Sequence, residues 1–362
     1  MRRLKKFTLR LLAGANVVSI AVMLLVGYSD RISPVDHPMA VIVGLTFPVV
    51  LVVNLAFLVF WLIVKVRYAL IPIIGLLLCF QPIRTYVPLN IRHNPPANAL
   101  KVLSYNVYLF ATLEKDTVQT NGILRYITAE NADIVCLQEA SVNDEMAILV
   151  DSVMGKVYQY GDTTNRKGED VLRIYSRYPI VGKEKLISSN GSASAAAFHL
   201  LIGGDTVTVV NCHLQSIGLS RDDKKAVSEM VDGNMQRDSA REESRFLIRK
   251  ITDAAVVRAP QAEAIAHYVD HLPDNRSIIL CGDFNDGPIS YTHRTIARRL
   301  TDCYVSAANG QGVSYNKSPF YVRIDNILCS SDWQPLACKI DKGITASDHY
   351  PIICWLKKRG KP

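Results

Sequence analysis

The sequence predicts an α/β sandwich that follows a small bundle of membrane-spanning helices. Three apolar stretches lie within the first 95 of 362 residues. From residue 96 onward, short apolar runs typical of buried strands alternate with segments of helical periodicity. This alternation favours sheets packed inside and covered by helices. We therefore divide the chain into a membrane segment, residues 1–95, and a second domain, residues 96–362.

The apolar stretches predict spans near residues 11–28, 39–64 and 66–82. The second has 26 residues without a charge, against the roughly 20 needed to cross a bilayer. The third is shorter and contains Pro72. Basic residues at the N-terminus and at Lys65 and Arg67 favour the cytoplasmic side, so three spans would place residues 96–362 outside, in the periplasm of a bacterial inner membrane. If the third segment does not cross, that domain lies inside.

The net charge is confined to the membrane segment. Residues 1–95 hold ten Lys and Arg against two acidic residues, which accounts for the formal +8 of the whole chain. The second domain is therefore neutral overall, whereas a nucleic-acid binder usually carries a basic excess. A local basic groove remains possible, formed by Arg241, Arg245, Arg249 and Lys250.

Eight cysteines are present, seven of them after residue 95. Their spacing does not match a zinc site, and most lie in apolar runs where Cys behaves as a small hydrophobe. The odd count disfavours a complete disulfide framework, although some pairing stays open.

Polar residues end the predicted strands. The apolar run 277–280 leads into Asp283 and Asn285, which point the same way because side chains alternate along an extended segment. Similar residues follow other apolar runs, and the full set is Asn106, Glu139, Asn211, His213, Asp283, Asn285, Asp325, Asp348 and His349.

Each of these residues alone has an ordinary explanation, such as a turn or a satisfied core histidine. Together, at the ends of six strands, they are hard to explain by packing, because buried charges cost several kcal/mol unless they are paired or bind a metal. Clustered carboxylates would repel one another without a hard cation among them. The pattern favours a catalytic site.

Six short motifs in this order resemble the endonuclease/exonuclease/phosphatase superfamily. They are Ser-Tyr-Asn-Val at 104–107, Leu-Gln-Glu at 137–139, Asn-Cys-His-Leu at 211–214, Gly-Asp-Phe-Asn at 282–285, Arg-Ile-Asp at 323–325 and Ser-Asp-His-Tyr-Pro at 347–351. The resemblance covers about residues 98–358. It implies a four-layer α/β/β/α sandwich that hydrolyses phosphoesters with Mg²⁺, with Mn²⁺ as the alternative metal.

The resemblance also implies a role for each residue. Glu139 would be the principal Mg²⁺ ligand, helped by Asn106 and Asp348. His349 would contact the scissile phosphate or take a proton, and Asp325 would hold its ring. Asp283 would activate water or protonate the leaving oxygen. Hydrogen bonds to the phosphate would come from Asn285, Asn211 and His213.

One position departs from part of the family. Abasic-site endonucleases carry an acid two residues after the Asn of the first motif, where this chain has Tyr108. The aromatic residue puts a DNA-repair role in doubt.

The sequence thus predicts a membrane-anchored, metal-dependent phosphodiesterase, phosphatase or nuclease. Its partners would be the lipid bilayer and a phosphoester substrate, whether a lipid head group, a small diester or nucleic acid, and no protein partner is evident. The alternative is a non-catalytic membrane receptor with the same fold. Loss of motif residues would mark that alternative, and the core motif residues are all present.

Residues 214–255 read as a charged excursion between two motifs. We expect a helix at 241–251 and a separate amphipathic helix at 260–272. The basic residues recur at i, i+4 spacing, which is typical either of a solvated helix or of a cover that grips phosphate.

Overall fold

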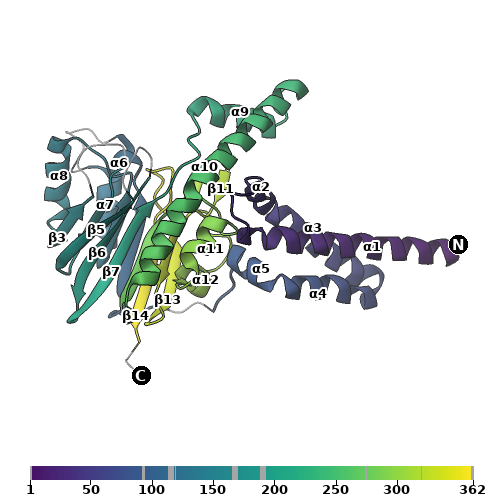
Figure 1. Ribbon diagram of the computed structural model, residues 1–362, viewed down its shortest axis with the longest axis horizontal. Helices are drawn as coiled ribbons and strands as arrows, with labels where there is room; N and C mark the ends of the chain where they lie inside the picture. Colours follow the sequence, from purple (N-terminus) through teal and green to yellow (C-terminus); the bar gives the residue numbers. More distant parts are fainter. Residues whose placement is uncertain are drawn as a thin grey trace.

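The computed structural model describes residues 2–91, 94–112, 118, 120–164, 170–187, 193–273, 275–318 and 320–359 (Figure 1). Two six-stranded sheets form its centre. The first has the order β13-β14-β1-β2-β4-β3 and the second β5-β6-β7-β8-β12-β9. The first contains β1 (Leu100–Asn106), β2 (Ile134–Gln138), β3 (Tyr160–Thr163), β4 (Arg173–Ser176), β13 (Trp333–Ile340) and β14 (Ile352–Lys358).

The second sheet and the helices complete the domain. The second sheet contains β5 (Ile180–Ile187), β6 (Ser194–Ile202), β7 (Asp205–His213), β8 (Ser277–Asp283), β9 (Thr301–Asp302) and β12 (Asp325–Cys329), and a hairpin pairs β10 (Tyr315–Lys317) with β11 (Phe320–Val322). The helices are α6 (Tyr108–Thr112), α7 (Gly122–Glu130), α8 (Asp144–Met154), α9 (Arg221–Val231), α10 (Arg237–His271), α11 (Tyr291–Ala297) and α12 (Cys303–Ala307).

The alternation of side chains along the strands builds four layers. Val102 of β1 and Ile279 of β8 share the core between the sheets. The next residue of β1, Leu103, points outward into a core with α7 and α8. Leu280 does the same on the other sheet, beneath α10 and α11. This arrangement confirms the predicted α/β/β/α sandwich.

Parallel pairs in the middle of each sheet bring motif residues to one edge. β1 runs parallel to β2, and β7 runs parallel to β8. β12 runs antiparallel to β8, with Asp325 opposite Asp283. Gly282 permits the close approach of β7, because its φ is +150° and a Cβ there would overlap the carbonyl of Cys212.

The N-terminal helices form a bundle beside the sandwich (Figure 1). Its elements are α1 (Arg2–Gly27), η1 (Ser29–Arg31), α2 (Ala40–Leu45), α3 (Phe47–Val64), η2 (Val66–Ala69), α4 (Leu70–Leu78) and α5 (Phe80–Tyr86). Two of its helices are long and apolar enough to span a membrane, and a third span results if the helices on either side of a 67° bend at Cys79 count as one.

The stretch predicted as one span at 39–64 is interrupted. The helix breaks at Thr46, whose hydroxyl donates to the carbonyl of Val43 at 2.7 Å. Pro48 lies in the first turn of α3, where its missing N–H is tolerated, and it disfavours continuation of the preceding helix. The short α2 consequently lies against α10 of the sandwich.

Several contacts join the bundle to the sandwich. The guanidinium of Arg323 donates to the carbonyl of Thr85 at 2.6 Å. Gln311 donates to the hydroxyl of Tyr86 at 2.7 Å. Ile289 packs into the bundle core with Phe47.

The excursion is a helical hairpin of α9 and α10. The two helices expected at 241–251 and 260–272 are one continuous helix, α10, with Pro260 inside it. Pro260 is exposed, so water can bind the carbonyl that loses its helical partner. All eight cysteines are buried free thiols.

Candidate active site

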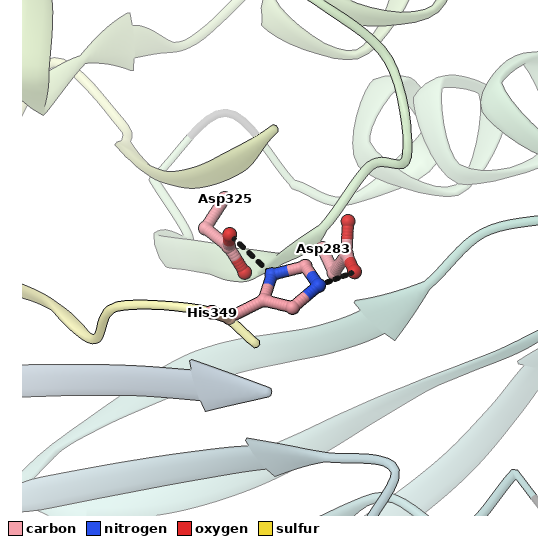
Figure 2. Close-up of side chains that lie close together, drawn as sticks. All are labelled: Asp283, Asp325 and His349. Carbon is pink, nitrogen blue, oxygen red and sulfur yellow. Dashed lines mark hydrogen bonds and ion pairs between the residues drawn. The ribbon is translucent and has the colours of Figure 1, made fainter. Parts of the chain in front are cut away.

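Side chains from five strand ends and the loop before β14 converge at one edge of the sandwich. Figure 2 shows their centre, where the ring of His349 lies between two carboxylates. Asp325 accepts a hydrogen bond from Nδ1 of His349 at 2.8 Å, and Nε2 of the same ring lies 3.6 Å from Oδ2 of Asp283. Ser347 holds the loop, donating to the carbonyl of Asn106 at 2.8 Å.

The two carboxylates control the charge of His349. Burial disfavours the charged ring, but the negative charges of Asp325 and Asp283 and the hydrogen bond that Asp325 accepts outweigh it and raise the pKa of His349 to about 10. The ring is therefore an imidazolium at neutral pH. With Nδ1–H bound to Asp325, it presents its second N–H toward Asp283.

A second histidine has the same arrangement. His213 Nδ1 bonds to Asp170 at 2.6 Å, while its Nε2 lies 3.8 Å from Asp283 and 3.6 Å from Glu139. Burial lowers its pKa, but Asp170 and then the other acids raise it to about 9. Two Asp–His pairs thus face the same oxygen of Asp283.

Asp283 is the buried centre of this network. Burial raises its pKa and the charge of Asp325 adds to the effect, whereas His349 and His213 oppose it. Its other oxygen accepts the backbone N–H of Asn285 at 2.8 Å. A carboxylate with a raised pKa between two imidazolium groups is suited to exchanging a proton.

Glu139 adds a partly exposed carboxylate. Its side chain is 26 % exposed, and Asn106 donates to it and to Asp283, at 3.0 Å each. The amide oxygen of Asn106 accepts the backbone N–H of Tyr108. In this arrangement Asn106 positions Glu139 and does not present an oxygen to a metal, which differs from its expected role.

Asn211 lies beneath the site and not in it. Both of its N–H groups are used, donating to the carbonyls of Leu137 and Arg173 at 3.1 and 3.2 Å, and its oxygen accepts from Gln138 at 2.7 Å. It fastens β7 of the second sheet to β2 and β4 of the first. The expected hydrogen bond from Asn211 to phosphate is therefore not supported, because its donors are already engaged.

The remaining predicted residues border a cavity of about 530 Å³. Asn285 and Asp348 line it beside Glu139 and His349. Asn285 donates one N–H to the carbonyl of Leu214 at 2.9 Å, which holds its side chain at the cavity wall. Of the nine predicted residues, eight thus lie in the site or on its wall.

Sequence reasoning missed three neighbours of the site. Asp170 directly precedes an apolar run and lies outside the six motifs quoted above. Tyr315 packs edge-on against His349 with ring centroids 5.1 Å apart. Lys224 of α9 lies 5.4 Å above the ring of Tyr315 and lines the cavity. No family motif includes these positions, and only the tertiary fold places them here.

The helical hairpin borders the same cavity through Leu219 and Lys224. Arg241, Arg245 and Arg249 are exposed, but Lys250 is not part of a free basic face. It binds Asp223 at 2.6 Å and thereby ties α10 to α9.

Two alternative sets of side chains in the site could hold a divalent cation. Ligand atoms of Asp283, Asp325 and His349 lie within 4.8 Å of one another. Their mutual hydrogen bond and the imidazolium charge favour a proton relay for this set. Glu139 and Asp348 line the cavity, and both are carboxylates, the hard oxygen ligands that Mg²⁺ prefers.

The comparisons with known proteins agree with this geometry. Residues 103–349 match the family model described as the Endonuclease/Exonuclease/phosphatase family. Residues 9–86 match a second model, described as a domain of unknown function (DUF8431). No curated protein matches the chain significantly.

Solved structures share the fold at low sequence identity. D. rerio TDP2 complexed with a single strand DNA product is 15% identical, covering 72% of this chain and 100% of that one, with a TM-score of 0.50. SmcL is 16% identical over 72% and 100%, also at 0.50. An endonuclease/exonuclease/phosphatase from Beutenbergia cavernae is 19% identical over 72% of each chain, at 0.50.

Proposed function

Because this chain belongs to the Endonuclease/Exonuclease/phosphatase family, we propose that it is a membrane-anchored hydrolase of phosphoester bonds that depends on a divalent metal. One observation carries the proposal. The Asp325–His349–Asp283 relay opens on a cavity that Glu139 and Asp348 also line. The complete relay disfavours a receptor without catalytic activity.

In the proposed reaction, Asp283 takes a proton from the attacking water. His349 donates its Nε2–H to the leaving oxygen as the bond between that oxygen and phosphorus breaks, and Asp325 keeps the ring in the required tautomer. His213, held by Asp170, provides a second positive charge beside the developing negative charge. Asn285 orients the substrate from the cavity wall.

A cation held by Glu139 and Asp348 would neutralise charge on the phosphate oxygens. The donor set suits Mg²⁺, and Mn²⁺ binds the same oxygen ligands. Asn106 supports this site by holding the carboxylate of Glu139.

Residues 1–95 would form the anchor and residues 96–362 the catalytic domain. The third apolar segment returns to the sandwich, and Thr85 and Tyr86, just after that segment, form hydrogen bonds to the sandwich. The N-terminus lies at the far end of the bundle (Figure 1). With the basic N-terminus in the cytoplasm, the domain would face the periplasm of a bacterial inner membrane.

The test uses the purified full chain in detergent. We expect Mg²⁺-dependent hydrolysis of a chromogenic phosphodiester, lost with EDTA and in His349→Ala. Phospholipid vesicles and an oligonucleotide, assayed in parallel, rank the substrate classes. A folded protein that hydrolyses none of these substrates with Mg²⁺ or Mn²⁺ would contradict the proposal.

A further inference from the structure

The cavity at the active site extends to the membrane bundle. Its polar end holds Glu139, Asp348 and His349. Its other end is lined by Val41 and Leu45 of α2 and by Pro48 of α3. One continuous space thus joins the reacting groups to helices that belong to the bundle.

The wall between these ends is largely apolar. The lining includes Ile217 and Leu219 from the segment before α9, and Ile251 of α10. Phe320 and Val322 of β11 and Ile289 also line it. The hairpin with β11 lies next to α2 (Figure 1) and exposes Tyr321, which is 56 % accessible. An exposed aromatic residue beside apolar helices is typical of a membrane interface.

We propose that the substrate is a membrane lipid with a phosphoester in its headgroup, whose acyl chain lies in this cavity against α2. The inference rests on the proposed function and names its substrate class. An apolar space that ends at Glu139, Asp348 and His349 matches a molecule with a hydrocarbon tail and a phosphate. A nucleic acid has no hydrocarbon chain to fill the apolar end.

The geometry also indicates the route of entry. α2 precedes α3, one of the apolar helices long enough to span the bilayer, so the apolar end of the cavity lies where α3 begins. A lipid could move into the cavity sideways without transferring its tail through water. Exposing each methylene of the tail to water would otherwise be unfavourable.

The test compares two tryptophan substitutions on α2. Leu45 lines the cavity and is 47 % exposed, whereas Val43, two residues away and 40 % exposed, does not line it. Leu45→Trp would fill the tail end, and Val43→Trp adds the same bulk outside. Each full-length variant is assayed on phospholipid vesicles and on a chromogenic diester.

We expect Leu45→Trp to lower the ratio of kcat/KM for lipid to kcat/KM for the chromogen at least tenfold, mainly through KM. Val43→Trp should leave that ratio within twofold of wild type. An unchanged ratio in Leu45→Trp would overturn the inference, as would cleavage of an oligonucleotide without cleavage of lipid.

A binding measurement separates this inference from the proposed function. Native mass spectrometry of His349→Ala purified from membranes should show a bound phospholipid. The Leu45→Trp substitution should abolish this bound phospholipid. Suppose that the wild-type protein hydrolyses no substrate, whereas the bound phospholipid is seen and lost as expected. The proposed hydrolase function then fails and the lipid site stands. If the chromogen is hydrolysed but no variant alters lipid turnover or binding, the lipid site fails alone.

Discussion

In the proposed site, Glu139 would supply a cavity-facing carboxylate for the cation, and His349 would belong to a buried proton relay. Glu139 is partly exposed, whereas Asp283 and Asp325 are almost wholly buried. A cation that exchanges with solvent requires accessible ligands, while a relay benefits from exclusion of water. The two groups can therefore be tested separately.

The first prediction concerns the metal. Glu139→Gln keeps the shape of the side chain but removes the charge that a hard cation requires, so Mg²⁺-stimulated hydrolysis should fall by orders of magnitude. The fold should survive, because Asn106 can still donate to the amide oxygen. Isothermal titration with Mg²⁺ should show weakened binding.

Asp325→Asn is the matched comparison in that titration. It alters the relay and should retain Mg²⁺ binding. If Glu139→Gln binds Mg²⁺ normally and Asp325→Asn does not, the cation lies instead among Asp283, Asp325 and His349.

The second prediction concerns the relay itself. Asp325→Asn removes the negative charge beside His349 and allows an amide N–H to face Nδ1, so the tautomer of the ring is no longer fixed and kcat should fall by about 10²–10⁴ with little change in KM. Asp170→Asn, in the second Asp–His pair, should act through His213 and cost less. Equal and small losses in both variants would exclude His349 as the proton donor.

At the scale of elements, the interface between α11, α12 and the bundle depends on the hydrogen-bonded pair of His293 and Asp302. Asp302 accepts from Nε2 of His293 at 2.9 Å, and Arg323 lies near it. Burial raises the pKa of Asp302, but His293 and Arg323 outweigh burial and lower it below its usual value. The pair stabilises the fold at pH values where Asp302 is ionised.

The third prediction follows from the sign of that shift. A lowered folded-state pKa gives stability that is present above about pH 4 and is lost as the pH falls through the folded-state value. Asp302→Asn should cost roughly 3 kcal/mol near neutral pH, and the difference should shrink below pH 4. Thermal melts in detergent measure it, with the exposed Asp253→Asn as control. A pH-independent difference would mean that Asp302 acts through packing.

The elements also show where sequence reasoning succeeds. Strand ends were predictable because an apolar run followed by a carboxylate or amide marks both the strand and its functional edge, as at Asp283 and Glu139. Asp170 was not, because it belongs to none of the six motifs and meets His213 only in the folded sheets. The role of Asn211 depends on carbonyls of the other sheet, which no local pattern reveals. Pro48 is a local signal for the helix break at Thr46. The continuous apolar run around it nevertheless favours the prediction of a single span.

At the scale of the whole molecule, the charge pattern predicts the orientation in the membrane. The fourth prediction is that alkaline phosphatase fused to the C-terminus is active and green fluorescent protein fused there is dark. The phosphatase folds only outside the cytoplasm. The reverse pattern would show that the segment near residues 66–82 does not cross and would place the site on the cytoplasmic side.

The attachment of the sandwich to the bundle has a consequence for the bilayer itself. Arg323 and Gln311 bind the last turn of α5, so the catalytic domain cannot swing freely on a tether. If the lipid inference holds, the enzyme draws substrate from a single leaflet, at a fixed depth. Each turnover would then change the headgroup area on one side of the membrane only, and sustained activity would build an imbalance of area between the leaflets that bends the bilayer unless lipids flip across.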